Sequence, residues 1–422
     1  MRMSSLLVLP VAMMLAVPGA QARSSAASDV AADVRELGTS IETIHPEPFR
    51  NVSKRRFHAE VDDLARRAPS LSRDELLVGV LRLIALLGPR NGHTGLFPLD
   101  PDHQRELHLY PIRLYDFADG IFVVDEGRGL GIRGARLVAV ADTPVDRVLE
   151  LVEPLVPRDN PSTLRASAPH YLLVAEVLDG IGVTDGAGRA EFTFEQPGGE
   201  VVTRTMTPVP AHEYVAAFHD KLYGHYPSIL PAAARPLYLA ASGRTLWART
   251  LAEGRAVYVG YNSVVAPAPA VVQRIQWLVD GAEVRRVIVD VRLNGGGDNT
   301  TYGPLTSLLG SATVDRRGRL YVLIGRATFS AAANFAAELD RDTRAIFVGE
   351  PTGGGVETYG DSTSLLLPTT GWNVRVAARY HERKRGPRDH RLAVGADLPV
   401  PVASARYFAG RDPVLERALR GL

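Results

Sequence analysis

A serine on a predicted strand-to-helix turn is the first residue in this sequence that could carry chemistry. Ser330 stands between a short apolar run at 320–324 and an alanine-rich stretch at 331–339, a pattern that predicts strand, turn and helix. The start of a helix offers free N–H groups and a partial positive charge to a developing oxyanion. Serine is also a common helix cap. The sequence therefore leaves two interpretations of Ser330 open, a cap and a nucleophile.

Three consecutive glycines follow another predicted strand and could form an oxyanion site. The strand is the β-branched run 286–291, and the glycines are 295–297. Glycine permits positive φ and a close approach of the backbone. We expect the N–H of Gly296 or Gly297 to act together with that of Ala331. The alternative is a plain connection from strand to helix.

A histidine in a glycine-flanked turn is the candidate base. His93 lies in the segment 91–95, which reads NGHTG and follows a helical pattern that ends at Gly88-Pro89. The ordinary pKa of histidine, close to neutrality, suits proton transfer at physiological pH. Taken alone, a loop histidine is more often solvated or capping than catalytic.

Several other chemistries are disfavoured. The chain has no cysteine, so disulfides, thiol catalysis and thiolate metal sites are excluded. It has no G-x-S-x-G elbow, no H-E-x-x-H pair and no phosphate-binding G-K-[ST] ending. A net charge of +1 argues against nucleic-acid binding. We expect no cofactor and no metal, although Asp298 and Asp361 are lone carboxylates beside glycine loops.

The N-terminus carries the pattern of a secretory signal. Arg2 precedes an apolar run at 6–17, and Ala20-Gln21-Ala22 is an A-x-A cleavage site. The run is shorter than the roughly 20 residues that a membrane-spanning helix needs. We expect cleavage near Ala22, a secreted or periplasmic mature protein, and no membrane span.

The composition, 45% hydrophobic and 23% charged, is that of a globular protein of two or three domains. The first part of the chain shows the apolar stripes of helices, and the second part shows short alternating strands. In the third part strands alternate with helices, a pattern that predicts an α/β layered core of βαβ units. The expected divisions are a signal peptide, an N-terminal helical segment that ends in the His93 loop, a β-rich module and the α/β core: 1–22, 23–106, 107–210 and 211–422.

Three motifs together resemble the tail-specific (C-terminal processing) serine peptidase family. They are DVRLNGGG at 290–297, TFSA at 328–331 and VGEPTGG at 348–354. The likeness extends over nearly the whole mature chain and implies a ClpP/crotonase-like core with an inserted PDZ-like module, best matched by GARLVAV at 134–140. It also implies a peptide or protein substrate; the oligomeric state is left open.

The resemblance further implies which base is used. Many members use a Ser–Lys pair with the lysine in the glycine loop after the serine, but 352–355 holds no lysine. That leaves the tricorn-like Ser–His arrangement, with His93 as the base. By the same resemblance Asp389 is the orienting acid, with Asp361 and Glu357 as competitors. Asn91 stands where related sequences often carry an acid.

These observations lead to an exported serine hydrolase, and we expect a peptidase. Ser330 attacks, His93 transfers the proton, and Tyr359 and Asp361 bind substrate. We expect an extended peptide to bind between the PDZ-like module and the core, by adding a strand to a sheet edge. Two alternatives are a non-catalytic ligand- or peptide-binding protein on the same fold and an esterase or acyl-transfer enzyme with the same Ser–His pair.

Overall fold

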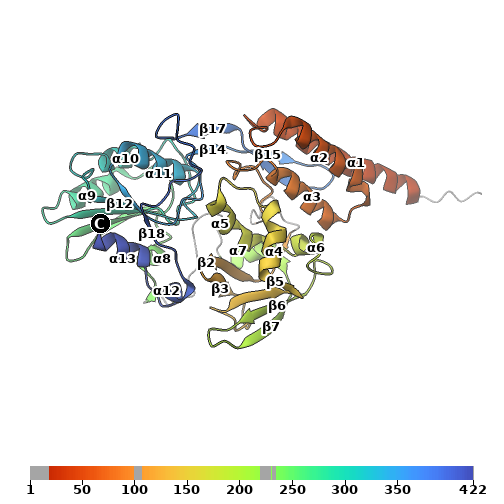
Figure 1. Cartoon of the computed structure of the whole chain (residues 1–422), viewed down its shortest axis with the longest axis horizontal. Helices are drawn as coiled ribbons and strands as arrows, with labels where there is room; N and C mark the ends of the chain where they lie inside the picture. The colour runs from red at the N-terminus through yellow and green to blue at the C-terminus, as the bar shows by residue number, and fades with distance from the viewer. Residues whose placement is uncertain (1–18, 99–106, 219–229, 231–233, 422) are drawn as a thin grey trace, which may run out of the picture.

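The computed structural model of the chain describes residues 19–98, 107–218, 230 and 234–421 (Figure 1). The apolar run of the expected signal peptide lies outside these residues. Across the described ranges, no helix combines the length and apolar character needed to cross a membrane.

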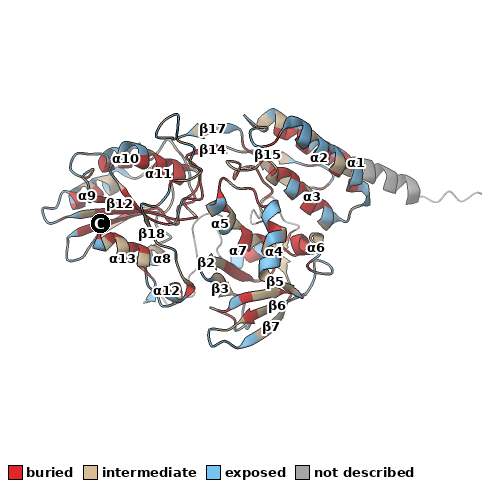
Figure 2. Ribbon diagram, viewed as in Figure 1, coloured by how far each residue is buried: buried red, intermediate tan, exposed pale blue. Residues whose placement is uncertain are grey.

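Three helices form the N-terminal segment, as the helical stripes predict: α1 (Gly19–Ile44), α2 (Lys54–Arg67) and α3 (Arg73–Ala85). A capping box starts α3, because Ser72 accepts from the Glu75 N–H while the Glu75 carboxylate accepts from the Ser72 N–H. The buried faces of the helices turn toward one another and the exposed faces turn outward (Figure 2). The third helix leads directly into the loop that carries His93.

The β-rich module is built on an antiparallel sheet in the order β2-β3-β4-β6-β7, with β5 paired to β4. Helix α7 packs into the same buried cluster through Ala211, Tyr214 and Phe218, so the module continues beyond the expected end at residue 210. Its elements are β1 (His108–Leu109), β2 (Ile112–Phe117), β3 (Gly120–Glu126), β4 (Arg136–Val140), β5 (Thr143–Pro144), α4 (Val145–Val152), α5 (Pro161–Tyr171), α6 (Ala175–Gly180), β6 (Ala190–Glu195), β7 (Val201–Met206), β8 (Val209–Pro210) and α7 (Ala211–Phe218).

The core is a six-stranded sheet in the order β18-β13-β12-β11-β10-β9. All neighbouring strands are parallel except β9 and β10. Runs such as AVYVGY and LYVLI are buried throughout, because helices cover both faces of a parallel sheet. The expected α/β core is confirmed. Its elements are α8 (Leu237–Ala240), β9 (Leu246–Leu251), β10 (Ala256–Tyr261), α9 (Pro269–Val279), β11 (Arg286–Asp290), α10 (Gly303–Leu309), β12 (Leu320–Ile324), α11 (Ala331–Asp342), β13 (Ile346–Gly349), β18 (Leu398–Pro399), α12 (Ser404–Phe408) and α13 (Pro413–Arg420).

Two two-stranded antiparallel sheets from the C-terminal part reach across to the N-terminal helices (Figure 1). They are β14 (Glu357–Gly360) with β17 (Arg379–Glu382), and β15 (Thr363–Leu366) with β16 (Asn373–Val376). Residues of β16 join the buried cluster of the helices and the module. Gly95 pairs with Arg375 of β16 as an isolated bridge. The His93 loop is therefore attached to the same part of the chain that follows Ser330.

Candidate active site

Ser330 lies at the N-terminus of α11 in a strained backbone conformation. Its φ of 50° and ψ of −129° are unfavourable for a residue with a side chain. Its side chain makes no capping hydrogen bond to the helix. The interpretation of Ser330 as a helix cap is therefore wrong. In α/β-hydrolases, strain of this kind at a strand-to-helix turn exposes the nucleophilic serine.

The glycine loop after β11 packs directly against this turn. A Cβ added to Gly296 would lie 2.6 Å from the Ser330 Cβ and 3.0 Å from the Ala331 nitrogen, so only glycine permits this approach. The Gly296 N–H donates to Asn294 Oδ1 at 3.0 Å. The N–H groups of Gly297 and Ala331 have no hydrogen-bond acceptor among the described residues. Of the two glycines expected to supply the oxyanion donor, Gly297 is the one whose N–H is available.

The His93 ring stacks on Phe329, the residue before Ser330, with ring centroids 4.4 Å apart and an interplanar angle of 20°. Its loop is held from both sides, since Ser362 Oγ donates to the His93 carbonyl at 2.7 Å and the Ala377 N–H donates to Thr94 Oγ1 at 3.1 Å. No hydrogen bond within the described part of the chain joins the His93 ring to Ser330 Oγ. The base therefore lies next to the serine turn without a direct bond to the nucleophile.

The electrostatic surroundings of His93 favour its neutral form. Burial lowers the pKa of His93, and the nearby Asp159 carboxylate opposes that effect. The Nδ1 atom is buried and has no hydrogen-bond partner among the described residues. A neutral imidazole can accept the proton of a serine hydroxyl.

Asp159 is a functional candidate that the sequence reasoning missed. The residue is fully buried and accepts three hydrogen bonds: from the Gly92 N–H at 2.8 Å, the Gly355 N–H at 3.1 Å and Thr358 Oγ1 at 2.8 Å. Burial raises the pKa of Asp159, while His93 and these donors lower it. The carboxylate thus joins the histidine loop to the loop after the serine.

Asn160 extends this connection. Its Nδ2 donates to the carbonyl oxygens of Thr352, Gly353 and Leu392 at 3.1, 2.9 and 2.9 Å. Its Oδ1 caps α5. In the sequence, Asp159 and Asn160 precede a proline at a helix start, which is an ordinary capping pattern. No signal in the local sequence distinguishes them from structural residues.

Asp389, expected as the orienting acid, lies elsewhere. Its carboxylate accepts from the Arg391 side chain at 2.9 and 2.8 Å and from the Arg385 N–H at 3.1 Å. The Arg391 guanidinium holds the pKa of Asp389 well below its usual range. The largest charge effects on the pKa of His93 come from Asp159, His381 and Asp361, not from Asp389. The expectation is therefore corrected, because local arginines already neutralise this carboxylate.

Glu357 is committed to a different cluster. It is buried and pairs with Arg50, Arg90 and Lys384 at 3.1, 3.1 and 3.0 Å. Burial raises the pKa of Glu357, but hydrogen bonds from Tyr380, Lys384 and Arg50 outweigh it and bring the pKa to about 2. Glu357 serves the attachment of the N-terminal helices to the core.

Asn91 is also structural. It hydrogen-bonds His45 Nε2 through Oδ1 at 2.7 Å, and its Nδ2 donates to the carbonyl oxygens at 87–89. Asn91 therefore shapes the turn that presents His93, and its amide is used within that turn.

The two residues expected to bind substrate differ in accessibility. Tyr359 is fully buried and its hydroxyl bonds Glu47 and Arg50, so the expectation that it contacts substrate is wrong. Asp361 is exposed and pairs with His381 Nε2 at 3.5 Å and with Arg379 at 3.3 Å. Its carboxylate also raises the pKa of His93. Asp361 stays a candidate at the rim of the site.

Comparisons with known proteins point to a peptidase. Residues 304–397, which include Ser330 and the glycine loop after β13, match the family model of peptidase family S41. No curated protein matches the sequence. A crystal structure of a CPAF mutant is 13% identical, with a TM-score of 0.66, and the match covers 93% of this chain and 96% of that one.

Two further solved structures are similar over most of their length. Mature CPAF complexed with lactacystin is 14% identical, covers 94% of this chain and 98% of that one, and has a TM-score of 0.62. The photosystem II D1 C-terminal processing protease is 17% identical over 88% and 92% of the two chains, with a TM-score of 0.37. At these identities the CPAF structures indicate a common fold. The family match over the serine and the glycine loop after it supports a serine peptidase of family S41.

Proposed function

We propose that the chain is an exported peptidase in which Ser330 is the nucleophile and His93 the general base. The observation that carries the proposal is Ser330, which lies at a helix N-terminus in a strained conformation and makes no capping bond. It stands beside two N–H groups that have no acceptor among the residues the structure describes. Backbone donors aimed at the site of developing charge are a large source of rate enhancement in acyl transfer.

The proposed reaction begins when Ser330 Oγ attacks the scissile carbonyl carbon and its proton passes to His93. The carbonyl oxygen becomes an oxyanion and accepts from the Gly297 and Ala331 N–H groups. His93 then protonates the leaving amine as the C–N bond breaks, and water hydrolyses the acyl-enzyme by the reverse sequence of proton transfers. The missing Ser330–His93 hydrogen bond fits this scheme, since such bonds often tighten only when substrate binds.

Asp159 takes the place proposed earlier for Asp389 in this scheme. Its buried carboxylate would stabilise the imidazolium that forms when His93 accepts the proton, and its bond to the Gly92 N–H would position the loop. We assign it as a positioning residue, because it acts on the substrate only through His93.

The substrate is proposed to be an extended peptide held between the PDZ-like module and the core. Strand β2 is an edge strand of the module sheet, and edge strands are where an extended peptide can add. Two of its carbonyl oxygens, those of Ile112 and Asp116, already accept from Tyr214 and Arg326. The N-terminal signal pattern supports secretion or a periplasmic location.

Two variants test the catalytic assignment. A fluorophosphonate probe should label the wild type and leave Ser330→Ala unlabelled, with circular dichroism as the folding control. His93→Ala should reduce peptide hydrolysis by about three or more orders of magnitude. Near-normal hydrolysis by His93→Ala would mean that another group is the base, and His381 is the neighbour to examine next.

The same experiment separates the alternatives. A folded wild type that the probe does not label would favour a non-catalytic binding protein on this fold. Labelling with hydrolysis of p-nitrophenyl esters but of no peptide would favour an esterase or acyl-transfer enzyme.

A further inference from the structure

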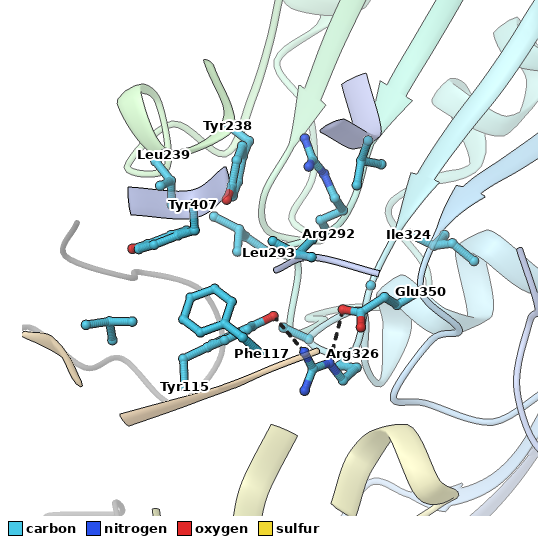
Figure 3. Close-up of a pocket in the computed structure, with 15 residues that line it drawn as sticks. Tyr115, Phe117, Tyr238, Leu239, Arg292, Leu293, Ile324, Arg326, Glu350 and Tyr407 are labelled. Atoms are coloured by element: carbon cyan, nitrogen blue, oxygen red, sulfur yellow. Dashed lines mark hydrogen bonds and ion pairs between the residues drawn. The ribbon is translucent and has the colours of Figure 1, made fainter. Parts of the chain in front are cut away.

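A recess lies where the β-rich module meets the carboxyl ends of β11, β12 and β13 (Figure 3). Its cavity volume is about 70 Å³. Tyr115 and Phe117 of β2 line one side, and Tyr238, Leu293 and Tyr407 line the other. A cavity of this volume has room for several water molecules or one side chain. Open α/β sheets bind ligands at the carboxyl ends of their strands.

The first cation of this recess is already neutralised. Arg292 is buried and donates to both carboxylate oxygens of Asp412 at 2.8 Å, and it also pairs with Asp290. Its guanidinium lies 4.2 Å from the centre of the Tyr238 ring. Arg292 thus presents no unbalanced positive charge to a bound group.

The second cation is neutralised in the same way. Arg326 pairs with Glu350 at 3.1 Å and donates to the Tyr115 hydroxyl at 3.3 Å (Figure 3). It also donates to the Asp116 carbonyl at 2.6 Å. A charged guest would lose its hydration without gaining a counter-ion. Arg326 Nη1 lies 3.6 Å from the Asp116 carboxylate and has no hydrogen-bond acceptor among the described residues. The recess therefore has one buried donor beside its apolar walls and suits an uncharged group.

The recess is close to the nucleophile along the chain. Ala327 lines it three residues before Ser330, and Leu293 lines it three residues before Gly296. Three residues span at most about 11 Å between Cα atoms. An extended peptide advances about 3.3 Å per residue. A side chain within about four positions of a bond held at Ser330 therefore comes within range of the recess.

We propose that this recess is a specificity subsite that binds one uncharged, leucine- or phenylalanine-sized side chain of the substrate near the scissile bond. The proposal rests on the peptidase function proposed above. It names the substrate class as peptides with an apolar residue at one fixed distance from the cleaved bond.

The test compares peptides that differ at one position among the four on each side of the cleaved bond. At one position, leucine or phenylalanine should give a kcat/KM at least about tenfold above aspartate or lysine. Val402→Trp fills the recess from a half-buried wall position and should abolish that preference. Val201→Trp, at an exposed site on β7, is the matched control and should leave the preference intact.

Fluorophosphonate labelling of Ser330 should proceed at the wild-type rate in Val402→Trp, which would show that the catalytic groups are intact. An unchanged preference for apolar residues in a folded Val402→Trp would overturn the proposal, and so would the absence of any such preference in the wild type.

A separate binding measurement tests the subsite even if the peptidase proposal fails. Saturation-transfer NMR with N-acetyl-phenylalanine amide should detect binding to Ser330→Ala and weaker or no binding when Val402→Trp is added. In the active wild type, this probe should inhibit peptide hydrolysis competitively. Equal binding to both proteins, or binding without competition, would overturn the assignment as a substrate subsite. Failure of wild-type labelling would instead overturn the peptidase proposal.

Discussion

Replacing Asp159 by asparagine should slow acylation of Ser330 and move its pH dependence. The change removes one buried negative charge that lies next to Gly92 and so one residue from His93. We take the separation between the Asp159 carboxylate and the His93 ring to be on the order of 7 Å. With an effective dielectric constant of about 20, the imidazolium then loses about 2 kcal/mol of stabilisation. That corresponds to a rate reduced roughly 30-fold.

The sign of the pH effect follows from the same charge. The Asp159 carboxylate raises the pKa of His93, against the dominant lowering by burial. Without that charge the pKa of His93 falls further, so the acid limb of the rate profile should move to lower pH while the plateau decreases. Fluorophosphonate labelling measured from pH 4 to 9 gives both quantities. The titration of the His93 Cε1 proton by NMR gives the pKa without any need for activity.

Two controls separate charge from structure. Thr358→Val removes one hydrogen-bond donor to Asp159 and leaves the carboxylate in place, so it should lower thermal stability and keep the acid limb at nearly its wild-type position. Asp389→Asn should change neither the acid limb nor the plateau of the pH profile of labelling. A folded Asp159→Asn protein with a wild-type limb and a rate within threefold of wild type would refute the role given to Asp159.

Three other predictions concern the surroundings of the site. Gly296→Ala should reduce probe labelling at least about 100-fold, because its Cβ would meet that of Ser330; equal labelling would show that the loop can shift. Asn160→Asp places an oxygen against three carbonyl oxygens and should lower the melting temperature by several degrees, as measured by calorimetry. An unchanged melting temperature would contradict the hydrogen bonds described for Asn160. Glu357 has a pKa of about 2 in the folded protein, against its ordinary value of 4.5. The free energy of unfolding of the wild type, measured with urea, should therefore fall as the pH drops from about 4.5 toward 2. Glu357→Gln should be less stable at pH 7, and its stability should depend less on pH in the acid range.

Much of the framework around the nucleophile could be predicted from short-range patterns. The apolar run, the turn at Ser330 and the alanine-rich helix are consecutive in the chain, so their hydrophobic periodicity and propensity were enough to predict strand, turn and helix. The same holds for the β-branched strand before the glycines and for the helices before His93. Each of these elements depends on neighbours within a few positions.

The identity of the buried acid could not be predicted in this way. Asp159 and Asn160 carry the ordinary signature of a helix start, and their other partners, such as Gly355, are far away in the sequence. Asp389, in contrast, has a suitable residue type and position but is neutralised by arginines close to it in the chain. A carboxylate acquires its role from its partners and its burial, neither of which is written in its residue type.

The sequence by itself determined the nucleophile, the glycine loop and the histidine as candidates, because residue types and local spacing limit which chemistry a chain can perform. Only the tertiary structure decided that Ser330 is strained and uncapped and that Gly297 keeps its N–H available while Gly296 does not. It also decided that Tyr359 is buried. Backbone strain, hydrogen-bond availability and burial result from contacts between distant segments, and those contacts exist only after the chain has folded.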